Sequence, residues 1–180
     1  MGYFRNPPYD ARAVANYFLS LAERDGKTLD QMKLQKLVYL AHGWSLALLD
    51  EPLITDKVEA WRYGPVIRSL YRAFANAGRN PITKPAYEVR FVGTKVTAIP
   101  LTLDEDSCNE RVRNLIEEVW KVYSPYTGIQ LSNYTHQEDS PWARTWKDSS
   151  LPQIIPDETI KDYFSKLAQN EPAVARQAAT

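Results

Sequence analysis

The chain has 180 residues, of which 44% are hydrophobic and 24% are charged, and its 22 basic residues balance its 22 acidic residues. These proportions are typical of one globular domain, and zero net charge gives no general electrostatic case for binding nucleic acid or an anionic membrane. The single cysteine, Cys108, excludes an internal disulfide framework and a zinc site built from thiolates, so we expect a reducing, cytoplasmic setting without membrane spans.

The N-terminal part of the chain is predicted to contain an irregular arm followed by two helices. The arm covers residues 1–9, and the first helix runs from the N-cap Asp10 to the terminating Gly26. The second helix, Met32–Leu49, carries apolar residues at spacings of three and four, with Trp44 among them. This pattern predicts the central core helix of the fold.

Two Thr-x-x-Gln sequences have the spacing of a capping box, in which a threonine and a glutamine satisfy the first backbone amides of a helix. Thr28 and Gln31 predict the start of the second helix. Thr127 and Gln130 predict a brief helix much later in the chain.

The segment after the second helix is predicted to be extended and then helical. Val58–Arg62 is a short extended run, and it precedes Gly64 and Pro65. Proline suits the first turn of a helix, so we expect a third helix that begins there and ends at Gly78.

The rest of the chain is predicted to contain one hairpin and several helices. Tyr87–Val92 and Lys95–Ile99 alternate around a Gly-Thr turn, as the strands of a hairpin do. The later helices are expected to begin at Asp104–Asp106, at Ser140-Pro141 and at Pro156-Asp157. The fold class is therefore mainly α with a small antiparallel β-hairpin (α+β), in one compact helical domain over residues 10–168, with a disordered tail over 169–180.

Polar side chains on the second helix need a separate explanation. Lys33 and Lys36 lie within or at the border of the apolar arc. Either their stems lie along the surface with the ammonium groups at the edge, or their charges pair with an acid or a partner. Gln35, Tyr39 and His42 lie opposite the arc, and we expect them to form a surface stripe that faces a partner.

Arginine and aromatic side chains alternate after the second helix. Such a pattern can stack bases and contact phosphates, but a four-residue spacing of arginines equally describes a solvated helix face. Aromatic residues at helical spacing are more often part of a core, so we do not expect nucleic acid to be the partner. The residues concerned are Trp61, Arg62, Tyr63, Arg68, Tyr71, Arg72 and Arg79.

The sequence contains no recognisable catalytic, metal or nucleotide motif. The two histidines, His42 and His136, lack metal-ligand spacing, and no P-loop or dinucleotide-binding glycine pattern is present. His136 precedes Asp139 and Ser140, but there is no nucleophile elbow, and such close neighbours rarely meet in triad geometry. We expect His136 and the following acids to cap and orient the helix that begins at Ser140. We predict no enzyme activity, no metal and no cofactor.

Four segments carry a family signature, namely Ala15–Leu19, Met32–Leu49, Ala60–Tyr71 and Thr135–Trp142. Together they resemble the Panacea antitoxin-associated domain family, which is also seen as the phage-associated protein GepA. Their order and spacing make the resemblance specific over about residues 10–165, although the family's late Thr-His…Pro-Trp element is tighter than it is here. Residues expected to carry the structural motif are Trp44, Gly64, Pro65, His136, Pro141 and Trp142.

The resemblance implies a toxin–antitoxin role. Family members neutralise different toxins, usually encoded next door, by direct protein contact, and some are adaptors that hand the toxin to a AAA+ protease. Others are borne by phages or prophages, so the alternative is a phage-derived regulatory or nucleic-acid-associated protein without a toxin. Aromatic residues and arginine are the usual anchors of protein interfaces. The residues expected to bind the partner are Lys33, Lys36, Tyr39, His42, Arg62, Tyr63, Arg68 and Tyr71.

Overall fold

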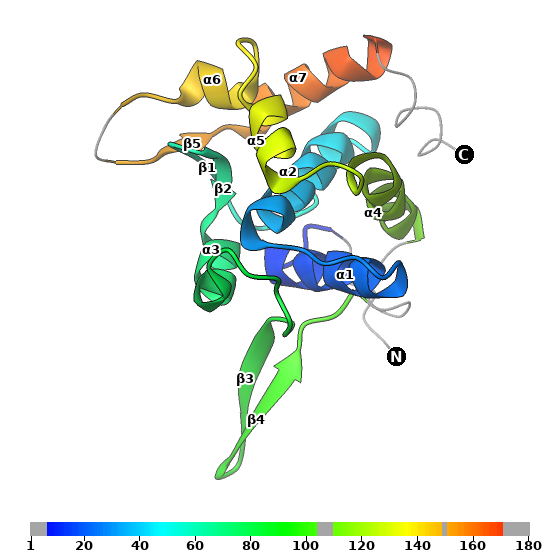
Figure 1. Cartoon of the computed structure of the whole chain (residues 1–180), viewed down its shortest axis with the longest axis vertical. Helices are drawn as coiled ribbons and strands as arrows, with labels where there is room; N and C mark the ends of the chain where they lie inside the picture. The colour runs from blue at the N-terminus through cyan, green and yellow to red at the C-terminus, as the bar shows by residue number, and fades with distance from the viewer. Residues whose placement is uncertain (1–6, 104–109, 149–150, 171–180) are drawn as a thin grey trace.

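Helix α2 (Gln31–Leu48) lies at the centre of the chain's computed structural model, and other helices pack around it (Figure 1). The structure describes residues 7–103, 110–148 and 151–170. The long helices that contact α2 are α1 (Ala11–Arg24), α4 (Glu110–Tyr123) and α7 (Asp157–Asn170), and the shorter α5 (Gly128–Thr135) joins them. The largest side chains buried between these helices are Phe18, Trp44, Trp120 and Phe164.

A small antiparallel sheet lies beside the helical core. Its strands are β1 (Val58–Trp61), β2 (Gly64–Ile67) and β5 (Gln153–Ile155), in the order β2-β1-β5. Trp61 pairs with Gly64 across β1 and β2, so the two strands are joined by the two-residue turn Arg62-Tyr63. The edge strand β2 leads directly into α3 (Arg68–Phe74), which ends in a short 3-10 turn, Ala75–Ala77.

A separate hairpin, β3 (Tyr87–Val92) with β4 (Lys95–Pro100), extends away from the helices (Figure 1). Its strand register places Phe91 opposite Val96 and Val89 opposite Ala98 on one face. That face is apolar and solvent-exposed, and the Phe91 side chain is 76% exposed. The hairpin therefore contributes little to the core.

Most of the expected architecture is confirmed. The fold is mainly α with small antiparallel β elements, and the predicted hairpin is present. Asp10 caps α1 by accepting a hydrogen bond from the Arg12 amide, and Thr127 and Gln130 form the predicted capping box of α5. Within the described residues, no helix combines the length and apolar content that crossing a bilayer requires.

Two expectations about helix starts are wrong. The N-cap of α2 is Asp30, whose carboxylate accepts a hydrogen bond from the Lys33 amide, rather than Thr28 in a capping box. Pro65 lies in strand β2 instead of the first turn of α3. Pro65 is accommodated because β2 is an edge strand, where a residue without an N–H can face away from its neighbour.

Strand β5 and a contact of the N-terminal arm were not anticipated from the sequence. Tyr9 is buried, and it forms backbone hydrogen bonds with Leu53 and Thr55. The expected helix start at Asp104–Asp106, Cys108 and the last ten residues lie outside the described residues.

Candidate functional site

Glutamine side chains of α2 form hydrogen bonds with backbone groups at the outer edge of β2 and within α3. The Gln35 side-chain amide donates to the Ile67 carbonyl at 3.1 Å, and its oxygen accepts from the Ile67 amide at 2.9 Å. One helical turn earlier, Gln31 donates to the Tyr71 carbonyl at 2.9 Å. Unpaired backbone groups at a sheet edge are costly when buried. Gln35 therefore takes the place of a further strand beside β2.

Lys36 continues this row of contacts and fixes the turn between β1 and β2. Its amine donates to the Tyr63 carbonyl at 3.0 Å and to the Pro65 carbonyl at 2.9 Å, and the residue is 1% exposed. Burial lowers the pKa of Lys36 to about 7. A Cβ on Gly64 would lie 2.7 Å from the Lys36 amine, and Gly64 also has a φ of +101°. Glycine is therefore required by both space and backbone conformation at this point.

Helices α5 and α6 (Pro141–Thr145) hold the same turn from the other side. The Ser132 hydroxyl donates to the Tyr63 carbonyl at 3.2 Å, and the Trp142 indole donates to the Trp61 carbonyl at 2.7 Å. His136 donates from Nδ1 to the Ser132 carbonyl, and its ring centroid lies 3.9 Å from that of Trp142. Segments that are distant in sequence therefore converge on the turn.

The result is a fixed backbone that exposes a basic and an aromatic side chain. Arg62 is exposed and lies over the Tyr63 ring, which is itself 66% exposed, with 5.7 Å between the guanidinium carbon and the ring centroid. Next to them, Arg68 forms two hydrogen bonds with Glu59 and lies over the Trp61 ring. Burial tends to raise the pKa of Glu59, but the hydrogen bonds from Arg68 and Trp61 bring that pKa below its usual range.

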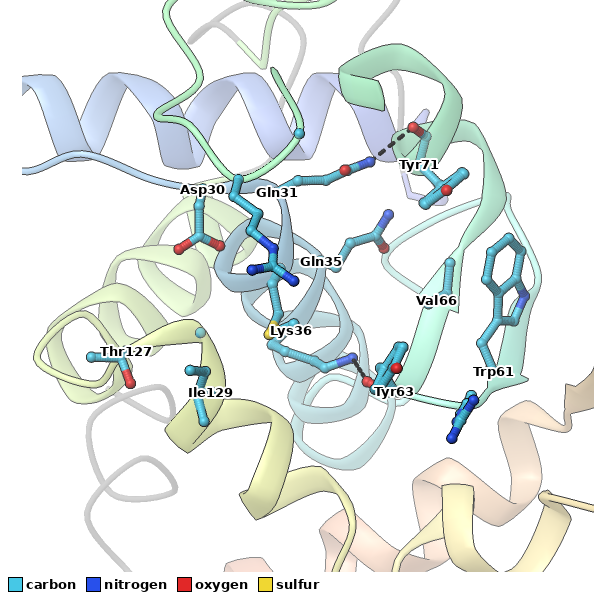
Figure 2. A pocket seen from close by; sticks show the side chains of 15 residues that line it. Asp30, Gln31, Gln35, Lys36, Trp61, Tyr63, Val66, Tyr71, Thr127 and Ile129 are labelled. Atoms are coloured by element: carbon cyan, nitrogen blue, oxygen red, sulfur yellow. Dashed lines mark hydrogen bonds between the residues drawn. The ribbon is translucent and has the colours of Figure 1, made fainter. Parts of the chain in front are cut away.

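A pocket of about 740 Å³ opens beside this turn (Figure 2). Trp61, Val66 and Tyr71 lie on one side of it, and Thr127 and Ile129 lie on the other, at the start of α5. The beginning of α2 and the turn complete the lining, through Asp30, Gln31, Met32, Gln35, Lys36, Arg62 and Tyr63, together with Gly78, Arg79 and Gly128. The pocket is thus built where the start of α2 meets the turn and the start of α5.

Comparison with known proteins identifies the family. The protein-family model described as "Antitoxin SocA-like, Panacea domain" matches residues 34–143 of this chain. The chain belongs to the Panacea-domain antitoxin family. It is also 32% identical over 159 residues to antitoxin SocA of Caulobacter vibrioides (strain NA1000 / CB15N), an alignment that covers 86% of this chain and 82% of that protein. No solved structure matches the chain.

The region matched by the Panacea-domain model contains the residues that hold the turn. It begins within α2, before Lys36, and it ends within α6, just after Trp142. The remaining motif residues have structural partners as well. Trp44 is buried and donates to the Tyr123 hydroxyl at 3.1 Å, while Pro141 is the first residue of α6.

The expected surface stripe on α2 is wrong, because Gln35, Tyr39 and His42 are buried. Gln35 bonds to the edge strand, and the Tyr39 ring packs against Phe164 of α7, where burial raises the pKa of Tyr39. His42 accepts from the Leu53 amide at Nδ1 and contacts Asp157 through Nε2. This hydrogen bond from His42 lowers the pKa of Asp157. Tyr39 and His42 are not part of the pocket lining.

Among the residues that the structure describes, Lys33 forms no ion pair with an acid, and it is not part of the pocket lining. Its amine donates to the Ser124 carbonyl at 2.7 Å, directly after the end of α4, and burial lowers the pKa of Lys33. A cation at a helix C-terminus is favoured by the helix dipole. In the described part of the chain, Lys33 therefore binds a backbone carbonyl instead of pairing with an acid.

The histidine and serine considered for catalysis have separate partners. Ser140 is buried and accepts from the Ala143 amide as the N-cap of α6, while His136 bonds to Ser132 and packs on Trp142. The expectation that His136 and the following acids cap this helix is therefore wrong, because Ser140 itself is the N-cap. Within the described residues, no group of three or more histidine, cysteine or acidic side chains could hold a metal ion.

Several pocket residues could not have been selected from the sequence alone. Met32 and Ile129 come from distant segments, and only long-range packing brings them to the same pocket. Among the other lining residues, Gln31 and Gln35 carry a pattern that the sequence shows. They are polar and four residues apart, so they lie on the same side of a helix.

Proposed function

We propose that this protein neutralises a toxin protein by binding it directly and without catalysis, through the surface around the Arg62-Tyr63 turn. The toxin is a protein encoded next to this chain's gene. Membership of the Panacea-domain antitoxin family supports the antitoxin role, and the geometry of the turn supports the choice of surface.

The observation that carries the choice of surface is the rigid display of Arg62 and Tyr63. Hydrogen bonds from Lys36, Ser132 and Trp142 fix the turn backbone, while the two displayed side chains remain exposed. Arginine and tyrosine are enriched among the residues that dominate binding energy at protein interfaces. A preorganised backbone also reduces the entropy lost on binding.

The test is co-expression of this chain with each neighbouring open reading frame. We expect one frame to be toxic alone and harmless when this chain is present. Tyr63→Ala and Arg62→Glu should each abolish that rescue without changing the thermal unfolding temperature. Tyr126→Ala, at a tyrosine that is 47% exposed, and Lys166→Glu, on the exposed side of α7, are matched controls that should rescue normally.

Two outcomes would contradict the proposal in different ways. If no neighbouring frame is toxic and rescued, the antitoxin role itself is refuted. If Phe91→Asp abolishes rescue while Tyr63→Ala preserves it, the toxin is bound at the β3–β4 hairpin instead of the turn.

Neutralisation can occur by occluding the toxin or by delivering it to a AAA+ protease. Some members of the resembled family are adaptors of this kind, and delivery requires the toxin to disappear when this chain is present. Immunoblotting of the toxin with and without this chain separates the two routes. Under delivery, deletion of the responsible protease restores the toxin level, whereas under occlusion the level is unchanged throughout.

A further inference from the structure

The pocket beside the turn has the size and lining of a ligand site. Its volume of about 740 Å³ falls within the usual range for ligand-binding clefts, roughly 300–1,000 Å³. The lining includes the rings of Trp61, Tyr63 and Tyr71, and it also contains the exposed apolar side chains of Met32 and Ile129. A large apolar side chain can therefore be buried here against aromatic surfaces.

The charges that line the pocket are not balanced. Arg62 and Arg79 are cations, whereas Asp30 is the one carboxylate among the described residues that line the pocket. Asp30 is already engaged as the N-cap of α2. Among the residues that the structure describes, Arg62 and Arg79 have no ion pair with a carboxylate. The pocket therefore has an excess of positive charge that the described part of the chain does not neutralise.

The two helices that begin at the pocket reinforce this imbalance. Asp30 and Gln31 at the start of α2 line it, as do Thr127 and Gly128 at the start of α5. Helix N-termini carry partial positive charge and unpaired backbone amides.

We infer that this pocket binds a short segment of the toxin in which a carboxylate lies next to a large apolar side chain. The inference rests on the proposed function and specifies the chemistry recognised at the same surface. The apolar side chain packs against the aromatic rings, and the carboxylate pairs with one of the lining arginines, Arg62 or Arg79. Charge-assisted hydrogen bonds between arginine and a carboxylate are among the stronger polar contacts in proteins.

A polyanion such as single-stranded DNA is the main rival occupant. Nucleic-acid binding depends on extended basic surfaces that contact many phosphates, and this chain has zero net charge. Arg68, which follows the turn, is already paired with Glu59. The concave apolar lining fits one side chain of a protein better than a run of phosphates.

A peptide titration of the full chain tests this inference without knowledge of the toxin. The probe is the tripeptide Asp-Trp-Asp, acetylated and amidated, and its control is Asn-Trp-Asn with the same blocked ends. A third peptide, Asn-Trp-Asn with a free C-terminus, distinguishes a terminal carboxylate from a side-chain carboxylate. Binding is followed by the amide resonances of the isotope-labelled protein, with an octathymidine oligonucleotide as the polyanion probe.

We expect at least one carboxylate peptide to bind about tenfold more tightly than the blocked asparagine peptide. The largest shifts should fall on lining amides such as those of Gly78 and Gly128. At least one of Arg62→Gln and Arg79→Gln should weaken binding severalfold. Arg72→Gln, an exposed arginine of α3 outside the lining, should not.

Equal binding of charged and uncharged peptides would overturn the inference, as would shifts confined to other surfaces. If the oligonucleotide binds more tightly than every peptide, the occupant of the pocket is a polyanion and not a protein carboxylate. The titration uses no toxin, so its result is independent of the rescue experiment. If the titration is positive but no toxin is rescued, only the proposed function is refuted. If Tyr63→Ala abolishes rescue as expected but the peptide titration is negative, only the carboxylate inference is refuted.

Discussion

The side-chain amine of Lys36 donates a 2.9 Å hydrogen bond to the backbone carbonyl of Pro65, and thereby ties the N-terminal part of α2 to the edge strand of the sheet. The same amine also bonds to the Tyr63 carbonyl. A neutral lysine amine has two N–H groups, which matches these two acceptors. Lys36 is therefore fully used in the fold when it is uncharged, and its burial makes the turn sensitive to its protonation.

We predict that the stability gained from Lys36 increases with pH. Burial lowers its pKa from 10.5 to about 7, so between these values the folded protein binds fewer protons at this amine than the unfolded chain does. The free energy of unfolding then rises by up to about 1.4 kcal/mol per pH unit within that window. Urea denaturation of wild type and Lys36→Met at pH 6.5 and pH 9 measures the effect, and other titrations largely cancel in the difference.

At pH 9, Lys36→Met should be less stable than wild type by about 1–3 kcal/mol, because the Pro65 carbonyl loses its side-chain partner. At pH 6.5 the gap should shrink, since wild type then bears the cost of burying a charged amine. A gap that stays constant between the two pH values would show that Lys36 has the same protonation state in folded and unfolded protein.

Gly43 should resist replacement even though it lies within a helix. A Cβ at this position would overlap the ring of Phe164 where α2 packs against α7. Gly43→Ala should therefore lower the free energy of unfolding by about 1–3 kcal/mol, whereas the same change at an exposed helical site usually stabilises. A double-mutant cycle with Phe164→Leu checks the cause, and strictly additive costs would argue against a clash between these two residues.

Trp142→Phe should loosen the turn with little other change. The substitution keeps an aromatic ring near His136 but removes the indole donor to the Trp61 carbonyl. We expect a loss of about 1 kcal/mol and faster hydrogen exchange of turn amides. Trp146→Phe is the matched control, since the Trp146 ring stacks on Trp142 and its replacement leaves the Trp61 bond intact. Equal effects of both variants would mean that ring packing, rather than the hydrogen bond, stabilises the turn.

The β3–β4 hairpin should tolerate changes that the core cannot. Phe91 is 76% exposed, whereas Phe164 is 1% exposed. Phe91→Ala should change the free energy of unfolding by no more than about 0.5 kcal/mol, and Phe164→Ala should cost about 3–5 kcal/mol. Denaturation curves of the two variants test this contrast. A large loss in Phe91→Ala would indicate that the hairpin face is covered in the folded protein.

The sequence predicted the helices well because their apolar spacing reflects a core that the structure contains. It failed at Gly64 and Pro65, where a local rule for helix starts competed with a tertiary contact. Gly64 has a positive φ and lies against Lys36, and Pro65 occupies an outer edge that α2 covers. Neither condition can be known before the sheet and α2 are placed together.

The candidate site was predicted in part. Arg62, Tyr63, Tyr71 and Lys36 were all expected to contact a partner, and the structure gathers them around one pocket. Gln35, Tyr39 and His42 of α2 were wrongly expected at the surface. Their polar groups suggested contact with solvent, but these side chains are buried and contact other parts of the fold. Polar side chains in a central helix satisfy backbone groups of elements whose position only the three-dimensional fold defines.

Photocrosslinking from position 63 is the most direct test that the turn contacts the toxin. Tyr63 is replaced by a benzoylphenylalanine residue in cells that also express the rescued toxin, and position 126 serves as the exposed control. We predict a covalent adduct between this chain and the toxin from position 63 and none from position 126. Adducts from position 126, or from position 91 on the hairpin, with none from position 63 would contradict the account.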